Sequence, residues 1–406
     1  MESSNILLLS FEFPPYPLAG TGFYAYNLVK SLEGHNVTLL TPNHSGHDQN
    51  PELPDNVQIK RIPMTSFNLF NKLSGQTTAN RSFIDRKTHF AIKVRNSIKK
   101  ELNLNDYDLF HSLNERDAAF LDLKYMNQFF PTIISVNDYY ILGASANPLK
   151  FHFKSTDLPL RYAHHNLMKR FYTKKLQQCT KIVPNCHFVS KIIQQQTGVP
   201  PEKIRVIHRG IDTKKFNIAP AKNKYENRKI LFVGPNAERK GALYLLQAAP
   251  SILQEYPETT FTFIGSCPWR YKKKLFSFIE QHNLKNKITY FEHLPQDQLL
   301  NYYQEANVFI MPSIMEALGQ VYLEAMTTRT PVIGANVGGV SEIITEDVGF
   351  LVEPQNPQAI SDAVKEIFSD PSFAKKLGDA GHKRVMEYFS IERQMKETLD
   401  LYKSLL

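Results

Sequence analysis

The chain has 406 residues, of which 42% are hydrophobic and 21% charged, and its formal net charge is +9. This length favours two globular domains of ordinary size, and the balanced composition excludes an extended disordered or fibrous protein. No apolar run approaches the roughly 18 residues that a membrane-spanning helix needs, so we do not expect an integral membrane protein.

Short β-branched and leucine-rich segments alternate with longer helical patterns through the first half of the chain. Helical spacing of apolar residues covers residues 22–32 and 188–196. Strands are predicted at residues 6–9, 37–40, 57–62, 109–111, 132–136, 181–184 and 205–207. This alternation is typical of a parallel sheet covered by helices on both faces.

A second series of strands and helices follows the polar segment 213–228, which has little periodicity and is interpreted as a domain boundary. Its strands are predicted at residues 230–233, 260–264, 288–291, 308–311, 331–334 and 349–352. The predicted fold is therefore α/β, with two doubly wound units, a cleft between them and ligands at the carboxyl ends of strands. A last helical pattern, 391–405, is expected to pack back across the first unit.

The positive charge is concentrated in the N-terminal half. Residues 1–205 contain 24 of the 48 Lys and Arg residues but only 16 of the 39 Asp and Glu residues. Much of it lies in segments 81–100 and 150–181, the second of which mixes cations with Phe and Tyr. Such a surface suits anionic lipid headgroups or an acidic acceptor, and a pair of solvated helix faces is the alternative. No nucleic-acid-binding motif accompanies the charge, so nucleic acid is not an expected partner.

The first Gly-rich segment, Gly20-Thr21-Gly22, matches the beginning of a dinucleotide-binding fingerprint but lacks its context. A proline-bearing loop separates it from the preceding strand, and no carboxylate follows the next strand. A nicotinamide-dependent enzyme is therefore not expected. The segment opens a helix whose positive end and bare amides could face a phosphate, and a plain tight turn is the alternative.

Lys240 lies in a loop between a predicted strand and a predicted helix. The loop begins at Gly234, after strand 230–233, and contains the neighbouring cations Arg239 and Lys240. A point charge near a helix start attracts a diphosphate, and an ordinary surface lysine in such a loop is the alternative.

Segment 312–326 carries the strongest functional pattern in the chain. Seven residues, including Gly319, separate Glu316 from Glu324, and the apolar spacing after Gly319 is helical. If a helix begins near Gly319, the two carboxylates flank a helix start whose free amides can bind phosphate. Carboxylates accept hydrogen bonds from hydroxyls, so the pattern predicts a site for sugar hydroxyls and phosphate.

Two further patterns are weaker. Gly338 and Gly339 follow a predicted strand and indicate a turn before a helix. Segment Asp106-Tyr107-Asp108 resembles a metal-binding D-x-D, but acidic residues are common in the turns that precede strands. No ligand spacing typical of a metal site accompanies it, and we expect neither a metal nor a cofactor.

Taken together and in order, these motifs resemble those of glycosyltransferase family 4, retaining enzymes with the GT-B fold of two Rossmann-like domains. The resemblance covers nearly the whole chain. It rests on the Gly-rich loop 19–22, the hinge strand 206–212, Lys240-Gly241, the E-x7-E pair Glu316 and Glu324, and Gly338-Gly339. The E-x7-E context is the specific part, and the other motifs corroborate it.

The resemblance implies roles for individual residues. Lys240 is expected to bind the donor diphosphate and assist its departure, Glu316 to contact the donor sugar, and Arg239 to supply a second cation. Glu324 is expected to hold the ribose hydroxyls, while backbone amides meet the sugar and phosphate. The expected donor-binding residues are Gly20, Gly234, Leu318, Gly319, Gln320 and Glu324.

The chain departs from the family pattern at three positions. Pro235 stands where the family usually has an Arg, Arg209 replaces the hinge Asn, and Asn137 replaces the His of a strand ending in His-Asp. Asn cannot take up a proton as imidazole does. Asn137 and Asp138 are the acceptor-side candidates.

Motifs and resemblance together predict a retaining, metal-independent glycosyltransferase of the hexosyl type. It would move a sugar from a nucleotide-sugar, expected to be a UDP-sugar, to a glycan or lipid-linked acceptor. The departures leave two alternatives: a non-catalytic nucleotide-sugar-binding or regulatory subunit, and a nucleotide-sugar epimerase. Residues 1–208 would form the acceptor-binding domain, 209–389 the donor-binding domain, and 390–406 the helix that packs on the first.

The sequence also carries an expectation about location. Three cysteines without metal-site spacing are interpreted as reduced thiols, and the apolar stretch 6–9 is too short for a signal peptide. We expect a cytoplasmic protein whose basic N-terminal domain makes peripheral contact with the anionic inner face of the membrane.

Overall fold

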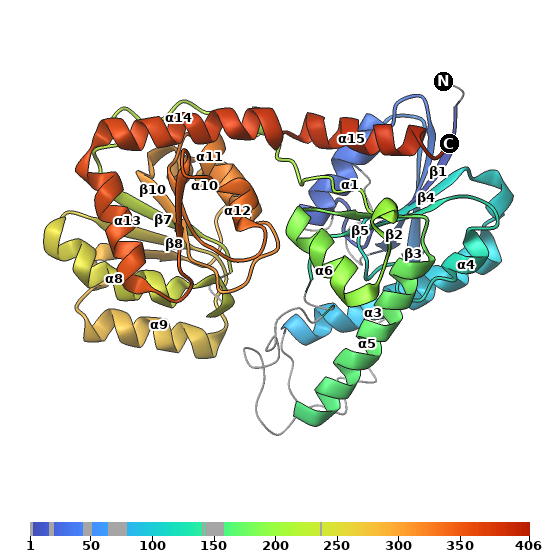
Figure 1. Cartoon of the computed structure of the whole chain (residues 1–406), viewed down its shortest axis with the longest axis horizontal. Coiled ribbons are helices and arrows are strands. Elements are labelled where there is room, and N and C mark those ends of the chain that lie inside the picture. Colours follow the sequence, from blue (N-terminus) through green and yellow to red (C-terminus); the bar gives the residue numbers. More distant parts are fainter. Residues whose placement is uncertain are drawn as a thin grey trace. The chain divides into compact units, whose positions relative to one another are not determined.

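The computed structural model describes residues 3–15, 20–43, 51–63, 79–139, 142, 158–235 and 238–406 (Figure 1). The chain divides into two units. The first comprises Met1–His208 and Met395–Leu406, and the second comprises Arg209–Gln394. A six-stranded sheet forms the centre of each unit.

The sheet of the first unit has the strand order β3-β2-β1-β4-β5-β6, and all of its neighbouring strands are parallel. The order reverses between β1 and β4, which makes their carboxyl ends the topological switch point of the sheet. The strands are β1 (Asn5–Leu9), β2 (Asn36–Asn43), β3 (Val57–Pro63), β4 (Leu109–Ser112), β5 (Thr132–Val136) and β6 (Lys181–Pro184).

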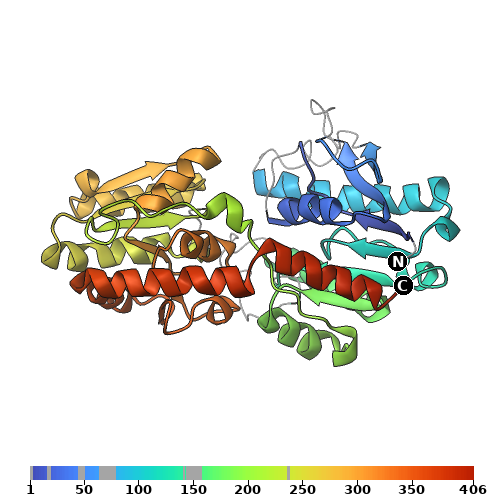
Figure 2. The same cartoon turned by 90° about the horizontal axis from the view of Figure 1, so that it is seen from above.

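Helices cover both faces of this sheet, with α1 and α15 on one face and α3 on the other (Figure 2). The central strands are accordingly buried from both sides, and Ile6, Leu7, Leu8 and Leu9 have no exposed surface. This double burial explains why β1 has a continuous apolar sequence instead of an alternating one. The helices are α1 (Gly20–Ser31), α3 (Ala79–Glu101), α4 (Leu123–Met126), α5 (Leu158–Gln178), α6 (His187–Thr197) and α15 (Ile391–Lys403).

The predicted strand 205–207 is not among the strands of the sheet. Ile204 forms an isolated bridge with Ile182, and the amides of Arg205 and Ile207 donate to carbonyls of β6 at 2.9 and 3.2 Å. The segment is extended beside β6 but leaves the first unit at His208, too soon to complete a ladder.

The end of α15, from Met395 onward, belongs to the first unit. The Tyr402 hydroxyl lies 2.6 Å from Nδ1 of His111, and Nε2 of the same ring lies 2.8 Å from the Ser135 hydroxyl. Tyr24 of α1 lies 3.4 Å from the Thr398 hydroxyl. Burial lowers the pKa of His111 to about 3, so this ring is neutral in the folded protein.

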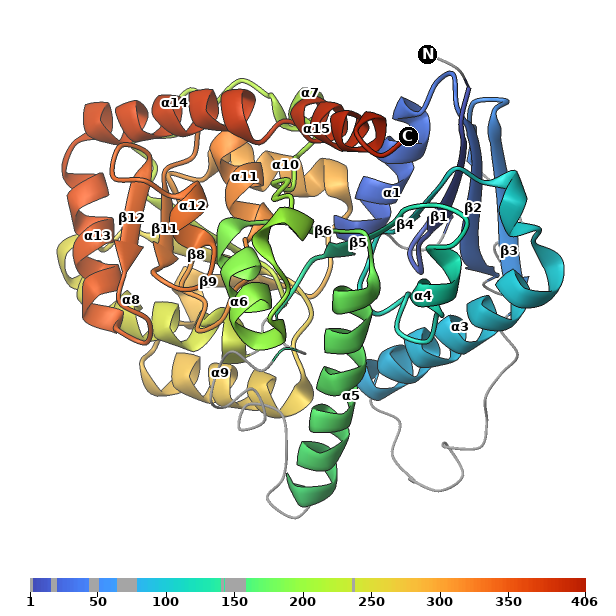
Figure 3. The same cartoon turned by 45° about the vertical axis from the view of Figure 1, so that its right-hand side comes forward.

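The second unit repeats the same topology, with the strand order β12-β11-β10-β7-β8-β9 and its switch point between β7 and β10. Helices α8, α9 and α13 pack together on one face of the sheet, and α11 and α14 pack together on the other (Figure 3). The strands are β7 (Lys229–Val233), β8 (Thr260–Ile264), β9 (Ile288–Phe291), β10 (Val308–Met311), β11 (Val332–Ala335) and β12 (Gly349–Val352). The helices are α7 (Thr213–Phe216), α8 (Ala242–Glu255), α9 (Trp269–Gln281), α10 (Gln296–Glu305), α11 (Gln320–Thr327), α12 (Val340–Ile343), α13 (Pro357–Ser369) and α14 (Pro371–Tyr388).

The polar segment 213–228, interpreted from its composition as a boundary, lies inside the second unit. Lys224 in this segment is completely buried, and its ammonium donates to the carbonyls of Tyr303 and Gln304 and to the Thr330 hydroxyl. Part of the packing of this polar segment is therefore made by a buried, hydrogen-bonded lysine.

The basic segments of the N-terminal half form the long helices α3 and α5, although residues 150–157 lie outside the described residues. Arg95 and Lys99 of α3 are exposed. Within the described part of the chain, no helix has both the length and the apolarity needed to cross a bilayer. The three cysteines are free and buried.

Candidate functional site

The motifs of the second unit meet at the carboxyl ends of β7 and β10, the two strands that flank its switch point. β7 leads into Gly234 and the short helical turn Glu238–Lys240, and β10 leads into the loop that contains Glu316. The amide of Ile314 donates to the carbonyl of Arg239 at 2.8 Å, which ties the two loops together. Asn236 and Ala237 lie outside the described residues.

Lys240 and Glu316 form a buried ion pair at this edge of the sheet. Each residue is only 8% exposed. Burial lowers the pKa of Lys240, the Glu316 carboxylate opposes this shift, and the nearby charge of Arg239 adds to it. An ammonium has three donors, so a Lys240 that contacts Glu316 retains the capacity to bind an anion.

Two glycine motifs allow backbone segments to approach this ion pair closely. Gly241 and Gly338 have positive φ angles of 77° and 59°. A Cβ atom at Gly338 would overlap the carbonyl oxygen of Glu316, and one at Gly241 would overlap that of Pro312. The amide of Gly339 donates to the carbonyl of Ala317 at 2.9 Å. These contacts hold the Glu316 loop from both sides.

Helix α11 begins directly after Gly319, where the sequence predicted a helix start. Gly319 has a φ of 92° and is buried, as is Leu318, whereas Gln320 is partly exposed. The first amides of a helix have no intrahelical acceptor, and together with the helix dipole they form a site suited to an anion. The expected donor-binding residues Leu318, Gly319 and Gln320 are thus placed at a helix N-terminus beside Glu316.

Glu324 lies one turn farther along α11 and is partly exposed. The Tyr303 hydroxyl of α10 donates to its Oε2 atom at 2.7 Å. Burial raises the pKa of Glu324 to about 7, while the Tyr303 hydrogen bond and the charge of Lys215 oppose this shift. The sequence patterns did not indicate Tyr303, because it follows no motif and lies 21 residues before its partner.

Gly234 directly follows β7 and packs against the neighbouring strand β8. Its amide donates to the carbonyl of Ile264 at 2.9 Å, and a Cβ at Gly265 would overlap the carbonyl oxygen of Gly234. Pro235 follows and is exposed. Arg239, the expected second cation, is half-buried next to Lys240.

The remaining predicted site residues belong to the first unit. Gly20 begins α1, and residues 16–19 of its loop lie outside the described residues. Asn137 follows β5 and donates from its side chain to the carbonyl of Leu113 at 2.9 Å. Asp138 pairs with Arg116 at 2.9 Å.

A buried carboxylate that the sequence patterns missed accompanies this pair. Glu115 accepts a hydrogen bond from the backbone amide of Asn137 at 3.2 Å. Burial raises the pKa of Glu115 to about 7 and the Asp138 charge adds to the shift, while the Arg116 guanidinium opposes it. The carboxyl ends of β4 and β5 therefore hold a polar cluster of Glu115, Arg116, Asn137 and Asp138.

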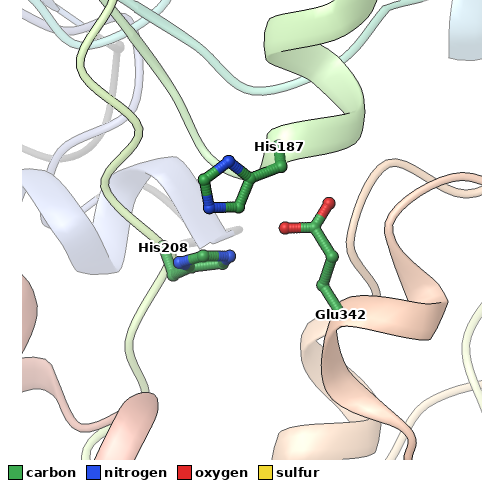
Figure 4. A group of neighbouring side chains, drawn as sticks. All are labelled: His187, His208 and Glu342. Atoms are coloured by element: carbon green, nitrogen blue, oxygen red, sulfur yellow. The ribbon is translucent and has the colours of Figure 1, made fainter.

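The D-x-D segment lies at the opposite end of β4 and has structural contacts. Asp108 accepts a hydrogen bond from the backbone amide of Asn5 at 2.7 Å, and Asp106 accepts one from the Asn103 side chain at 2.8 Å. Elsewhere in the first unit, the rings of His187 and His208, both labelled in Figure 4, face each other with centroids that lie 5.4 Å apart.

Comparison with known families shows to which family the chain belongs. The family model described as glycosyl transferases group 1 matches residues 213–384, and that described as glycosyltransferase family 4 matches residues 18–215. An uncharacterized glycosyltransferase of Methanocaldococcus jannaschii is 32% identical over 422 residues, covering 98% of each chain. The chain therefore belongs to the group 1 and family 4 glycosyltransferases, as the motif resemblance predicted.

Solved structures confirm the predicted fold class. Sucrose-phosphate synthase from Thermosynechococcus elongatus superposes with a TM-score of 0.78 at 21% identity, covering 99% of each chain. HepE of Anabaena, solved in complex with UDP-glucose, superposes with a TM-score of 0.70 at 15% identity, covering 99% of this chain and all of HepE. The fold is GT-B, with two Rossmann-like units.

Proposed function

We propose that this glycosyltransferase transfers a hexosyl group from a UDP-sugar with retention of the anomeric configuration and without a bound metal ion. The observation that carries the proposal is the buried Lys240–Glu316 pair beside the first turn of α11. A diphosphate would find an ammonium and helix amides there, and the sugar would find the Glu316 carboxylate. The UDP-glucose complex of HepE supports the choice of nucleotide.

The chemistry proposed for this site needs little from the protein beyond charge. The bond between the anomeric carbon and the diphosphate breaks, the acceptor oxygen bonds to the same face of that carbon, and the acceptor proton passes to the departing phosphate oxygen. Negative charge grows on the diphosphate during this step, and Lys240, Arg239 and the α11 amides would stabilise it. Such stabilisation is strongest where water is excluded, as around the buried Lys240.

Nucleotide binding tests the donor site directly. UDP, GDP and ADP should be compared by thermal shift with the wild type, with Glu324→Ala, and with Glu346→Ala as a control at an exposed carboxylate. Binding to the folded state alone raises stability by about 2.7 kcal/mol at a hundredfold excess over Kd. We expect UDP to stabilise the wild type and the control but not Glu324→Ala. The donor assignment fails if none of the three nucleotides stabilises the wild type.

A non-catalytic nucleotide-sugar-binding subunit is a second candidate function, favoured by Asn137. The side chain of this residue donates to a backbone carbonyl and cannot take up a proton. Incubation with UDP-sugars and a panel of acceptors separates the alternatives: transfer supports the main proposal, and binding without turnover supports the subunit. Conversion of the donor sugar without any acceptor would indicate an epimerase.

For the acceptor, we propose a glycan or lipid-linked molecule bound by the first unit, with Asn137 and Asp138 at the carboxyl end of β5. The same unit would contact an anionic cytoplasmic membrane surface through the basic helices α3 and α5. The exposed Arg95 and Lys99 support this proposal, because cations near an anionic bilayer are attracted to it. Sedimentation with phosphatidylserine vesicles at low salt tests it, and a protein that stays in the supernatant would contradict it.

A further inference from the structure

The C-terminal end of α10 is held by the buried side chain of Lys224, whose pKa burial lowers to about 7. Lys224 donates to the carbonyl of Tyr303 at 2.7 Å and to that of Gln304 at 3.1 Å. The carbonyls at the end of a helix have no intrahelical partner, and a positive charge there also interacts favourably with the helix dipole. The Thr330 hydroxyl donates to the same Tyr303 carbonyl at 3.1 Å. The Thr328 hydroxyl also donates to this carbonyl, at 3.4 Å, so the backbone of Tyr303 is fixed by three side chains.

The ring of Tyr303 is fixed as well. It has no exposed surface, and it packs against Phe309 and Phe216 with centroid separations of 5.9 and 6.5 Å. Burial raises the pKa of Tyr303 well above its ordinary value, and the Glu324 carboxylate adds to this shift. The hydroxyl therefore remains protonated and acts as a hydrogen-bond donor.

The carboxylate of Glu324 presents two different oxygens to its surroundings. Oε2 accepts the Tyr303 hydrogen bond, and among the described residues no second side chain donates to Glu324. Since Glu324 is partly exposed and Oε2 already accepts the Tyr303 hydrogen bond, Oε1 is the oxygen that we expect to receive a ligand. A rigid donor on one oxygen fixes the direction of the other.

We propose that Tyr303 is a positioning residue for donor binding, which holds one oxygen of Glu324 so that the other receives the ribose hydroxyls of the nucleotide. This inference rests on the proposed function, because it assumes that Glu324 binds the ribose. Lys224 and the aromatic packing keep the hydroxyl in place, so that Glu324 is preoriented before the nucleotide arrives.

The hydrogen bond from Tyr303 also affects the protonation of Glu324. Among the described residues, the titratable groups that act on Glu324 are Tyr303 from α10 and Lys215 from α7, and both lower its pKa against the effect of burial. Because this hydrogen bond lowers the pKa of Glu324, we expect removal of the Tyr303 hydroxyl to raise it further, so that more of the carboxyl is protonated at neutral pH. A protonated carboxyl carries an O–H donor and accepts hydrogen bonds from a diol less well than a carboxylate does.

The test is the pH dependence of UDP binding by wild type and Tyr303→Phe, measured by calorimetry. The substitution removes one hydroxyl and keeps the buried ring. At neutral pH we expect binding to weaken about tenfold, which is a typical effect for a hydrogen bond to a charged group. The loss should shrink toward about pH 9, where the carboxyl is ionised in both proteins. Tyr225→Phe is the matched control, because it removes a hydroxyl that donates only to the backbone carbonyl of Arg329 in the same unit.

The outcomes separate this proposal from the function on which it rests. If UDP binds the wild type and Tyr303→Phe equally well, Tyr303 has no positioning role and the donor site stands. Weakening by the same factor at every pH would indicate a merely structural defect and would also overturn the role. If no nucleoside diphosphate binds the wild type, the function fails. In that case, a carbon-13 titration can still measure the pKa of the Glu324 carboxyl in the wild type and in Tyr303→Phe. An unchanged pKa in the variant would contradict the proposed coupling between Tyr303 and Glu324.

Discussion

Lys240 shows how a single residue acquires its chemistry from its surroundings. The chain has 48 Lys and Arg residues, and a lysine ammonium that is exposed on the surface binds an anion only weakly. Here it is 8% exposed and contacts Glu316, so its field is not screened by water. A buried ion pair of this kind contributes little net stability, because desolvation offsets the attraction between the partners. An ion pair that adds little net stability is expected to serve the function of the site instead of the stability of the fold.

Substitution of Lys240 tests that interpretation. Loss of one preorganised contact to a developing charge typically costs about 3–4 kcal/mol of transition-state stabilisation, so Lys240→Ala should reduce kcat about a hundredfold to a thousandfold. Lys285→Ala removes an exposed lysine of the same unit and serves as the control. Turnover should be measured by release of UDP. A Lys240→Ala enzyme with near-normal kcat would remove Lys240 from the mechanism.

At the scale of the element, the site depends on loops that are held by glycines. Gly338 begins the turn before α12, and its missing side chain lets that turn contact the Glu316 loop. A positive φ angle alone costs an alanine about 1–2 kcal/mol, because its Cβ then crowds the backbone. At Gly338 the Cβ also overlaps a carbonyl, and a backbone atom cannot move aside as a flexible side chain can.

A pair of alanine substitutions separates these two effects. Gly198 has a φ of 65°, close to the 59° of Gly338, but a Cβ there meets nothing within 4 Å. Gly198→Ala should therefore show only the backbone strain, about 1–2 kcal/mol in unfolding experiments. Gly338→Ala should lose more stability and also weaken UDP binding, because it displaces the Glu316 loop. Equal effects of the two substitutions on UDP binding would contradict this role of the turn.

The elements were largely predictable because their signals are local. Twelve of the thirteen predicted strands correspond to strands of the two sheets, since a short apolar run between turn signals depends on neighbouring residues only. Segment 205–207 has the same pattern but lies where the chain changes units, and composition does not encode that. At the site, the E-x7-E pair was predictable because both residues lie in one continuous segment, a loop followed by a helix. Tyr303, Lys224 and Glu115 were not, because each acts through partners brought together only by folding.

At the scale of the whole molecule, the first unit is completed by residues from the far end of the chain. His111 has a neutral ring between Ser135 and Tyr402, and all three side chains are buried. Tyr402→Phe leaves one ring nitrogen without its partner, which typically costs about 1–3 kcal/mol. Hydrogen exchange of the β4 amides should show this loss. Tyr24→Phe should cost less, because its contact with Thr398 is longer, 3.4 Å against 2.6 Å.

The buried histidine also makes stability depend on pH. The folded pKa of His111 is about 3 and its ordinary value is 6.5, so below pH 6.5 the unfolded chain binds a proton that the folded chain does not. Stability must therefore fall as the pH decreases from about 6.5 toward 3, with a contribution of up to about 1.4 kcal/mol per pH unit. The slope of unfolding free energy against pH should be shallower in His111→Gln, whatever its absolute stability. An unchanged slope would mean that His111 does not titrate in this way.

The division of the first unit between Met1–His208 and Met395–Leu406 has a consequence for synthesis. A ribosome releases β1 to β6 before the second unit, but Thr398 and Tyr402 leave the exit tunnel after it. The second unit is continuous from Arg209 to Gln394 and can finish folding while the first still lacks part of its core. The nascent chain would thus complete its domains in the reverse of the order in which it begins them, with the Tyr402 side of His111 uncovered until α15 emerges.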